Sequence, residues 1–447
     1  MIFRNGQEVG STSATIFEDA GLFAGTTFAY QAAARSGSGE MSPLSAAAEA
    51  TTEPFEVNDV AMGDAGVSYA NVEVTDDNRF LVWFEQSTDG SGLGAMWHCA
   101  IDGATGALVP SDCKGFRAFD STLWGRANVG IDETGVFYVG MDRSGRLILV
   151  RPTGPSTGSV AALSTPADAL RRAIYPTNLA DGRKFVFWIR NSDVPGGGYS
   201  PPGNASFTLQ YLDLSNPAII HDVETQPKPP IGMAPMDVGF ARWFRGKASL
   251  TYGGYDANGF VQVKEFNAET PSLLPHFATD DQNHKIDPWS MAFGADDLII
   301  AGVNGEARSV VYRRSAGGSL FNAVEEIVPS PSMLANPSLA QSHQSIEFDG
   351  RLYTAYQVNE KGAGFYETIT GTGEIWLSTV LQNSPVESQW RLSGSADPAI
   401  ASLAKSEPEP CVGTSKVWVF YSAVPNGSDF STSVWTLRRA DTPVGKR

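Results

Sequence analysis

The sequence predicts an all-β protein whose main body is built from one repeated four-stranded unit. Three observations lead to this prediction. The chain of 447 residues holds 46 glycines, 27 prolines and 11% aromatic residues, whereas charged residues make up only 18%. Strand-like segments recur about every 50 to 60 residues over most of the chain. One strand of each repeat is almost continuously apolar, which is typical of a strand packed on both faces.

Each repeat opens with a short strand that carries polar residues, often beside a proline. Pairs such as Asp-Pro and Asn-Pro are typical of a chain that enters a strand from a turn. The opening strands are expected to start near residues 68, 126, 174, 237, 287, 336 and 397. This spacing suits four-stranded blades, so it predicts a β-propeller of seven blades over residues 54–447. Counts of six and eight stay open, because weak repeats are easily miscounted.

The second strand of each repeat is the clearest part of the pattern. It follows a polar turn, such as Asp181-Gly182 or Asp349-Gly350, that suits a tight hairpin. The apolar runs cover residues 80–84, 136–140, 185–189, 248–252, 298–302, 352–356 and 417–421. We expect each run to lie between two neighbouring blades, where both of its faces are buried.

The two ends of the repeat array predict how the ring closes. The last repeat offers three strands, around residues 397–403, 416–423 and 432–438, and lacks a fourth. A strand-like segment at residues 55–60 precedes the first repeat and has no partner there. We expect this segment to complete the last blade, since closure removes exposed sheet edges.

The first 53 residues do not share the repeat. They turn at Arg4-Asn5-Gly6, form a corner at Asp19-Ala20-Gly21-Leu22 and continue in a strand that ends at Tyr30. Asn-Gly is a strong hairpin signal. This stretch resembles the second half of a fibronectin type III domain, in which Tyr30 lies near the buried corner tyrosine of the family. The resemblance implies a partial β-sandwich over residues 1–53, a spacer of the kind common in secreted bacterial enzymes that act on polysaccharides.

The net charge of −17 bears on partners and location. It argues against nucleic acid and anionic lipid, because phosphate recognition needs clustered lysine and arginine. No apolar run is long enough to span a membrane. Together with the fibronectin-like segment, these features predict a bacterial extracellular or cell-surface protein, with a signal sequence outside these residues.

The cysteines suggest one disulfide and no metal. Cys99 and Cys113 are expected on neighbouring strands of one blade, where a disulfide is geometrically possible. Cys411 is expected in a loop that contains proline and glycine. No Cys/His cluster indicates zinc, and no phosphate loop or dinucleotide fingerprint indicates a cofactor. We therefore predict neither a metal nor a cofactor.

Candidate site residues follow from the expected position of the opening strands, which line the central channel of a propeller. The candidate binding residues are Asn71, Asn128, Asn178, Asp237, Arg242, Trp289, Asn336, His343 and Asp397. The candidate catalytic residues are Tyr175, Asp287, His284 and Arg126. Each also has a structural alternative, since Asp and Asn serve turn geometry and Trp and His serve blade cores.

The predicted architecture resembles seven-bladed polysaccharide lyases, such as ulvan lyases. In these enzymes His or Tyr acts as base and acid, and Arg neutralises the carboxylate of a uronate. Tyr175, His284 and Arg126 are residues of these types. A resemblance to sialidases is weaker, because only residues 87–92 resemble their repeated aspartate turn. Paired carboxylates, as in glycoside hydrolysis, are the other option considered for Asp287.

These observations predict a secreted carbohydrate-active propeller that binds a polysaccharide at the channel mouth. If it is an enzyme, lyase or glycoside hydrolase chemistry is expected. The alternative is a non-catalytic adhesin or a scaffold for other extracellular proteins, which the low count of five histidines suits. The sequence leaves open whether the protein is an enzyme.

Overall fold

The structure is a computed structural model that describes most of the chain. The residues outside the description are 18, 20–26, 52–56, 61–66, 76, 88–89, 121–126, 164, 166–169, 179–181, 192–205, 228–240, 245–246, 251–253, 256–260, 268–271, 279–285, 294–297, 305–308, 315–320, 328–338, 349–350, 360–373, 382–385, 393–401, 415, 429–434 and 446–447. The described residues form antiparallel β-sheets and contain no helix. The prediction of an all-β protein is confirmed.

The N-terminal sheet and the first three sheets of the main body each hold four strands. The N-terminal sheet has the order β2-β1-β3-β4, from β1 (Ile2–Arg4), β2 (Gln7–Gly10), β3 (Thr27–Ala32) and β4 (Ala48–Thr51). The next sheet follows chain order as β6 (Val67–Val74), β7 (Phe80–Ser87), β8 (Leu93–Ile101) and β9 (Leu108–Asp120). Then come β10 (Asn128–Asp132), β11 (Gly135–Met141), β12 (Leu147–Pro152) and β13 (Gly158–Ala162). The following sheet is β14 (Leu170–Asn178), β15 (Lys184–Asn191), β16 (Ser206–Asp213) and β17 (Ile220–Pro227).

The second half of the main body continues in the same manner. A two-stranded sheet of β18 (Ala241–Phe244) and β19 (Lys247–Leu250) precedes a three-stranded one of β20 (Gly254–Tyr255), β21 (Val261–Asn267) and β22 (Ser272–Ala278). Two four-stranded sheets follow. They are β23 (Ile286–Phe293), β24 (Leu298–Asn304), β25 (Ser309–Arg314) and β26 (Phe321–Ile327), and then β27 (Leu339–Phe348), β28 (Arg351–Asn359), β29 (Glu374–Leu381) and β30 (Val386–Arg391).

The last sheet joins the two ends of the repeat array. Its order is β31-β32-β33-β5, from β31 (Leu403–Val412), β32 (Lys416–Pro425), β33 (Thr436–Gly445) and β5 (Val57–Val60). β5 pairs antiparallel with β33, from Val57 opposite Ala440 to Val60 opposite Leu437. The prediction that an early segment completes the last sheet is therefore confirmed.

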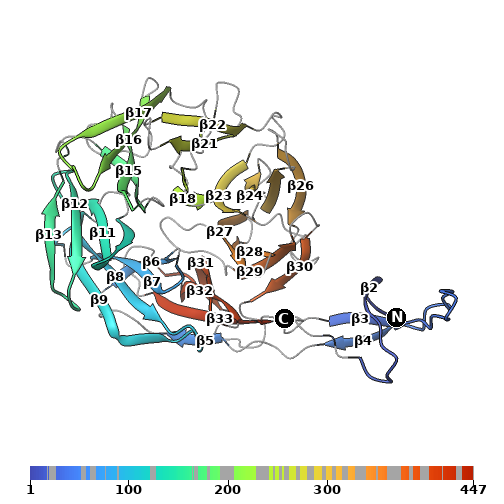
Figure 1. The fold of residues 1–447 in the computed structure, drawn as a ribbon. Helices are drawn as coiled ribbons and strands as arrows, with labels where there is room; N and C mark the ends of the chain where they lie inside the picture. The colour runs from blue at the N-terminus through green and yellow to red at the C-terminus, as the bar shows by residue number, and fades with distance from the viewer. Residues whose placement is uncertain are drawn as a thin grey trace.

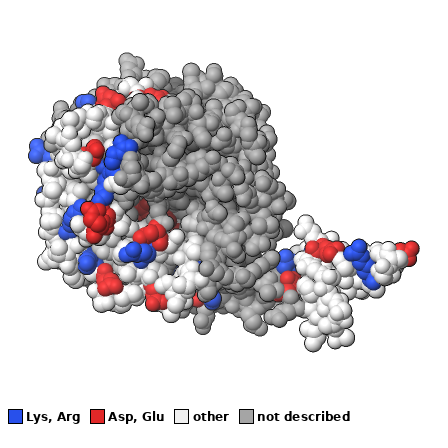
Figure 2. Space-filling view, in the orientation of Figure 1, with Lys and Arg blue, Asp and Glu red and all other residues white. Residues whose placement is uncertain are grey.

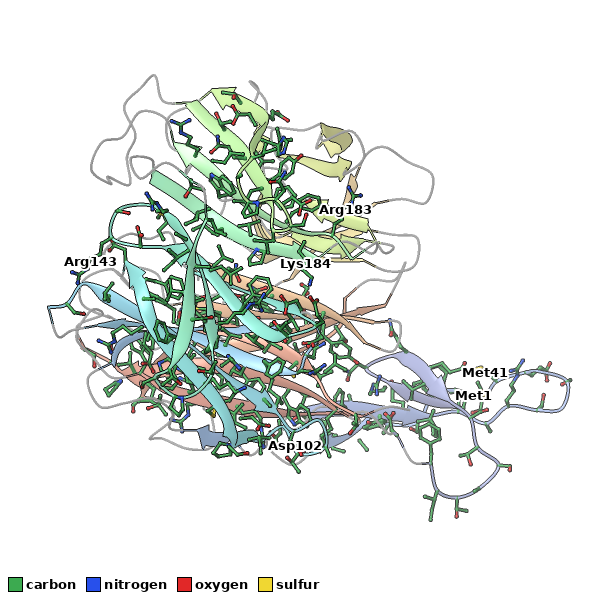
Figure 3. The ribbon with its side chains drawn as sticks, turned by 60° about the vertical axis from the view of Figure 1, so that its left-hand side comes forward. Met1, Met41, Asp102, Arg143, Arg183 and Lys184 are labelled. Atoms are coloured by element: carbon green, nitrogen blue, oxygen red, sulfur yellow. A yellow bond between two sulfur atoms is a disulfide. The ribbon has the colours of Figure 1, made fainter. Side chains whose placement is uncertain are left out.

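The sheets stand side by side in a ring, which is a β-propeller-like arrangement (Figure 1). The first strand of a sheet lies nearest the centre of the ring. Accordingly, β27 contacts β23 and β31, β31 contacts β6, and β14 contacts β10 and β18. The N-terminal sheet lies outside the ring, where Figure 3 labels Met1 and Met41 far from Lys184.

The core lies between the faces of neighbouring sheets. Trp83 of β7 and Trp418 of β32 belong to one buried cluster, which joins the first sheet of the ring to the last. A second cluster joins β28 to β32, with Tyr353 and Tyr421 both 1% exposed or less. Further clusters join the first ring sheet to the second and the second to the third. The apolar runs predicted for second strands are thus buried on both faces wherever their side chains are described, apart from the half-buried Phe80.

Six described opening strands lie close to the starts predicted for the repeats. β6, β10, β14, β18, β23 and β27 begin within four residues of the predicted positions. The predicted start near 397 lies outside the described residues, and the described strand β31 begins at Leu403.

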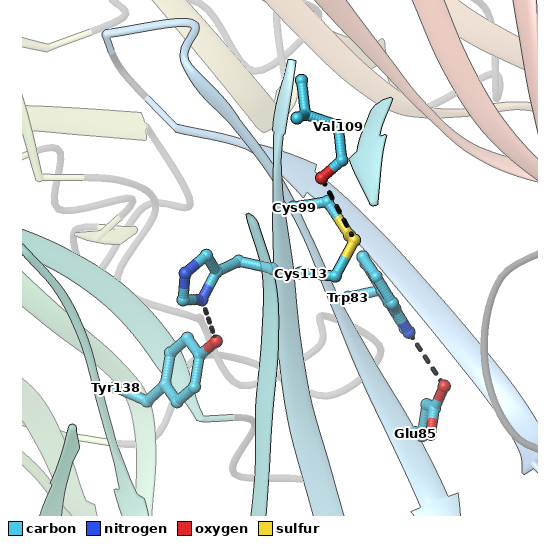
Figure 4. The surroundings of a disulfide bond; sticks show 7 residues. Trp83, Glu85, Cys99, Val109, Cys113 and Tyr138 are labelled. Atoms are coloured by element: carbon cyan, nitrogen blue, oxygen red, sulfur yellow. Dashed lines mark hydrogen bonds between the residues drawn. A yellow bond between two sulfur atoms is a disulfide. The ribbon is translucent and has the colours of Figure 1, made fainter. Parts of the chain in front are cut away.

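The structure contains the disulfide that the sequence left possible, and one prediction about a cysteine was wrong. Cys99 and Cys113 form a disulfide between β8 and β9, and the sulfur of Cys113 lies 3.6 Å from the carbonyl oxygen of Val109 (Figure 4). Cys411 was expected in a loop, but it lies in β31 and is fully buried. The nearby Pro408 and Pro410 suggested a loop. In the structure Pro408 lies in a bulge, where the strand does not need its missing N–H.

Candidate functional site

One irregularity recurs in the innermost strands of the ring. Five of the described opening strands, β6, β14, β23, β27 and β31, shift register against their second strand. In each case the inner strand holds one residue more than its partner, which defines a β-bulge. After the bulge only four or five residues pair before the strand ends. The bulge therefore marks the same position of each repeat, and we call these positions the inner bulges.

The inner bulges include two residues selected from the sequence, Trp289 and His343. Trp289 lies in the bulge of β23, between Pro288 and Ser290. His343 lies in the bulge of β27, between Gln341 and Gln344. The bulge of β6 likewise contains Tyr69, between Val67 and Ala70. Bulges re-aim side chains and are frequent beside active sites, so this position of the repeat is a candidate site.

Other selected residues flank the inner bulges or lie on the same strands. Tyr175 follows the bulge of β14 and pairs with Phe187, and Asn178 is the last paired residue of that strand. Asp287 precedes the bulge of β23, opposite Val303. Asn71 follows the bulge of β6, and Arg242 pairs with Ser249 in β18. For these residues the structure describes the position of the backbone in the repeat.

Five selected residues lie outside the described residues. They are Arg126, Asp237, His284, Asn336 and Asp397. Their roles stay predictions.

Asn128 is the one candidate residue from the sequence whose side chain the structure describes. Asn128 is the first residue of β10, and the last paired residue of that strand, Asp132, lies four residues later. In β6 and β27 the first paired residue after the bulge also lies four residues before the last pair, so Asn128 occupies the equivalent position. Its side-chain oxygen accepts a hydrogen bond of 2.8 Å from the backbone N–H of Val129. The residue is half-buried. The side-chain oxygen of Asn128 thus stabilises the local turn into the strand.

The structure adds charged residues of β31 that sequence reasoning missed. Lys405 is 1% exposed, and its Nζ donates a hydrogen bond of 2.9 Å to the carbonyl oxygen of Leu403. Glu409 is 4% exposed, and its Oε2 lies 3.4 Å from the backbone nitrogen of Val74, which donates to it. Between them, Glu407 lies in the inner bulge with a φ of 54°. The proline-rich sequence Ser406-Glu407-Pro408-Glu409-Pro410 had suggested a loop, which hid this strand from the sequence analysis.

A second charged group lies at the hairpin between β10 and β11. Asp132 accepts hydrogen bonds from Arg151 to both carboxylate oxygens, at 3.0 and 2.5 Å. Burial alone would raise the pKa of Asp132, but the bonds from Arg151 and Thr134 hold it at about 2. Lys184 of β15 contacts Glu133 and lies 3.9 Å from Asp132, so this group also joins two sheets. It stabilises the ring at an edge and away from the inner bulges.

His98 is a structural residue between two sheets. It is 4% exposed, and its Nδ1 is within hydrogen-bonding reach of the hydroxyl of Tyr138, the contact dashed in Figure 4. Its ring packs edge to face with that of Phe80. Burial, assisted by the positive charge of Lys114, lowers the pKa of His98 to about 4. His98 is therefore neutral at pH 7 and joins β8 to β11 without facing the axis.

The described residues offer no group of three His, Cys, Asp or Glu side chains that could hold a metal ion. They also contain no helix long and apolar enough to cross a membrane. On the face shown in Figure 2, the described positive and negative side chains are interspersed. The inner strands thus carry polar, charged and aromatic residues beside their bulges.

Comparisons with known proteins give partial matches. No family model matches the chain. It is 32% identical over 104 residues to exoglucanase B of Cellulomonas fimi, covering 23% of this chain and 9% of that enzyme. It is 31% identical over 116 residues to a poly(3-hydroxybutyrate) depolymerase of Ralstonia pickettii, covering 25% and 23%. The matched parts span less than a quarter of either relative.

Similar solved structures belong to proteins of differing chemistry. An ulvan lyase bound to a -[GlcA(1-4)Rha3S]- saccharide has a TM-score of 0.49 at 10% identity, with 88% of this chain and 97% of the lyase covered. An acylaminoacyl peptidase of Pyrococcus horikoshii has 0.45 at 10%, with 83% and 52% covered. A Trypanosoma rangeli sialidase mutant has 0.38 at 12%, with 94% and 58% covered. All three scores lie below 0.5, and none of these proteins assigns a function to this chain.

Proposed function

We propose that this protein is a carbohydrate-active propeller that binds a polysaccharide at the axis of its ring. The observation that carries the proposal is the recurring inner bulge, which sets Tyr69, Trp289 and His343 at one position of the repeat. Aromatic residues with a polar atom suit sugars, because a ring face stacks on the C–H face of a pyranose while the polar atom bonds a hydroxyl. The partial match to an exoglucanase supports the same substrate class.

We propose seven blades for the ring. The two-stranded and three-stranded sheets lie consecutively in the chain, and β19 contacts β21. Counting β18 to β22 as one blade, with β19 and β20 as two parts of its second strand, gives every blade four strands. The main body also holds six four-stranded sheets, so the ring has seven blades in all.

The N-terminal sheet supports a partial fibronectin type III module. Its order β2-β1-β3-β4 places two hairpin strands beside two later ones, as in one sheet of such a sandwich. The hydroxyl of Tyr30 donates a 2.8 Å hydrogen bond to Asp19, eleven residues upstream. Arg4 also bonds Asp19, which ties the corner to β1. We assign residues 1–53 to this module and residues 54–447 to the propeller.

For a catalytic version of this function, the selected residues supply the required groups. Tyr175 and His284 are the proposed acid and base, and Arg126 would neutralise a uronate carboxylate during elimination. Asp287 is the proposed carboxylate for a hydrolytic mechanism. The remaining selected residues bind the chain on either side of the cleaved bond.

A location outside the reducing cytosol is part of the proposal. The disulfide between Cys99 and Cys113 supports it, because such bonds persist in oxidising compartments. The partial fibronectin-like module is consistent with a secreted or cell-surface protein.

The test is incubation with a panel of polysaccharides, followed by assays for binding, reducing ends and unsaturated uronates. Binding to at least one glycan, weakened by Trp289→Ala and His343→Ala, is expected. His221→Ala is the matched control, because His221 lies on the outermost strand β17 and stacks on Tyr211. Binding without product would indicate the non-catalytic alternative, and the absence of binding to every glycan would refute the proposal.

A further inference from the structure

We infer that the disulfide between Cys99 and Cys113 locks the ring, so that its reduction lets the ring open between its first and last sheets. We call this contact the seam; it lies between the sheet of β6 to β9 and the strands β31 to β33 (Figure 1). β5 pairs with β33 in the last sheet and is followed in the chain by β6. Because the disulfide lies within the first sheet, the ring is closed by noncovalent contacts, namely this pairing and the packing across the seam. The inference goes beyond the proposed function and does not depend on it.

The tip of the β8–β9 hairpin, residues 102–107, docks on the last sheet across the seam. The carbonyl oxygen of Gly103 accepts two hydrogen bonds from Thr414, one of 2.8 Å from its backbone N–H and one of 3.0 Å from its hydroxyl. Gly106 is buried although the residues of the tip before it are exposed. A Cβ at Gly106 would lie 2.5 Å from the ring of Trp418. The tip is therefore held by two hydrogen bonds and by its backbone packing closely on Trp418.

The disulfide spans an interruption in the strands that carry this tip. The ladder between β8 and β9 shifts register at Cys99, which stands opposite residues 110–113. The bond from Cys99 to Cys113 bridges this irregularity (Figure 4). Beyond it, Ala100 and Ile101 pair with β9 before the tip begins. Since a disulfide restricts the chain that it closes, its reduction would loosen the short segment that carries the tip.

The disulfide and the seam also share one buried cluster. Cys99 is fully buried in the cluster that contains Trp418, and the half-buried Cys113 packs against it. Cys411 of β31 belongs to the same cluster. Its Sγ lies 3.6 Å from the carbonyl oxygen of Asn78, in the turn between β6 and β7. Opening of the seam would therefore expose the Cys411 thiol, which the closed ring buries.

The opening step is an ordinary disulfide reduction. A dithiol such as dithiothreitol supplies two electrons and two protons and is oxidised to its cyclic disulfide, while Cys99 and Cys113 become thiols. Disulfides persist in oxidising compartments and are reduced in the cytosol, so the ring is locked in the former and loosened in the latter. β6 and β31 carry inner bulges on the two sides of the seam. Oxidation therefore also fixes this part of the axis.

The experiment follows the reactivity of Cys411, which is the one thiol of the oxidised chain because the other two cysteines form the disulfide. Burial, assisted by the charge of Asp77, raises the pKa of this thiol to about 12, so an alkylating reagent modifies it slowly in the closed ring. The full chain is labelled with iodoacetamide before and after treatment with dithiothreitol, and mass spectrometry follows the peptide that contains Cys411. We expect reduction to speed the labelling of Cys411 about tenfold or more.

Variants separate the seam from the rest of the ring. Cys99→Ala combined with Cys113→Ala removes the bond without a reductant and is expected to speed labelling as reduction does. Gly106→Ala displaces the tip from Trp418 with the disulfide intact, and it is also expected to speed labelling. Asp132→Asn is the matched control, because it weakens the ring at the β10–β11 hairpin, away from the seam. It is expected to leave the labelling rate unchanged.

Unchanged labelling of Cys411 after reduction, or in Gly106→Ala, would overturn the inference. Equal acceleration by Asp132→Asn would also overturn it, because the thiol would then be reached by unfolding of the whole ring. Far-UV circular dichroism is recorded beside the labelling. A β-sheet spectrum retained after reduction is expected, and its loss would show that the disulfide supports the entire fold rather than the seam.

Discussion

The buried histidine between the first two sheets of the ring gives a pH dependence that can be worked out in advance. His98 lies against Tyr138 and Phe80, and burial lowers its pKa from 6.5 to about 4. In the unfolded chain the same imidazole takes up a proton near pH 6.5. Between these two pH values, the unfolded state binds one proton that the folded state does not.

The sign and size of the effect follow from this difference. Stability rises with pH wherever the unfolded state binds more protons, so the contribution of His98 is fully present above pH 6.5. It is lost as the pH falls toward 4, and it changes no further below that value. The difference between a pKa of 6.5 in the unfolded chain and about 4 in the folded protein corresponds to about 3 kcal/mol of unfolding free energy.

The assay is urea denaturation of the native protein and of His98→Gln at several pH values between 4 and 7. Carboxylates titrate in both proteins, so the difference between the two isolates His98. We expect the native protein to lose about 3 kcal/mol more than the variant between pH 7 and pH 4. Equal pH dependence in both proteins would show that His98 does not remain neutral in the folded state.

Three further outcomes are expected. Asp132→Asn should lower the free energy of unfolding by about 2 kcal/mol at pH 7, because the folded-state pKa of about 2 shows that the hydrogen bonds from Arg151 stabilise the ionised carboxylate. An unchanged urea midpoint would contradict this. That stability should be lost as the pH falls from about 4 to 2, which acid titration followed by fluorescence can check. Cys113→Ser should lower stability by about 3 kcal/mol through loss of the cross-link, and a Tm unaffected by both this change and reductant would refute it. Replacing residues 57–60 with a glycine-serine linker should expose the edge of β33 and cause concentration-dependent association, visible by light scattering; a stable monomer would show that β5 is dispensable for closure.

The repeat was predictable because its signal is hydrophobic and periodic. A strand between two blades must be apolar on both faces, so runs such as Phe185–Ile189 and Val417–Tyr421 identify themselves in the sequence. The closing strand was predictable by counting, since one segment was left over at each end. The disulfide required only that its two cysteines lie on neighbouring strands.

The site was less predictable because bulges have no comparable sequence signal. A bulge adds one residue to a strand and leaves the apolar pattern of the partner strand unchanged. Trp289 and His343 were selected because they lie on opening strands, and only the register shows that they share one position of the repeat. Glu407 was missed because two prolines beside it are usually a loop signal.

The central claim is that the inner strands of this ring bind a glycan, and a crystal structure with a bound hexasaccharide tests it most directly. We predict electron density for the sugar at the axis, with a pyranose stacked on Trp289 or Tyr69. Sugar bound solely to the outer strands or to the N-terminal sheet, with the axis side of β31 unoccupied, would contradict the claim.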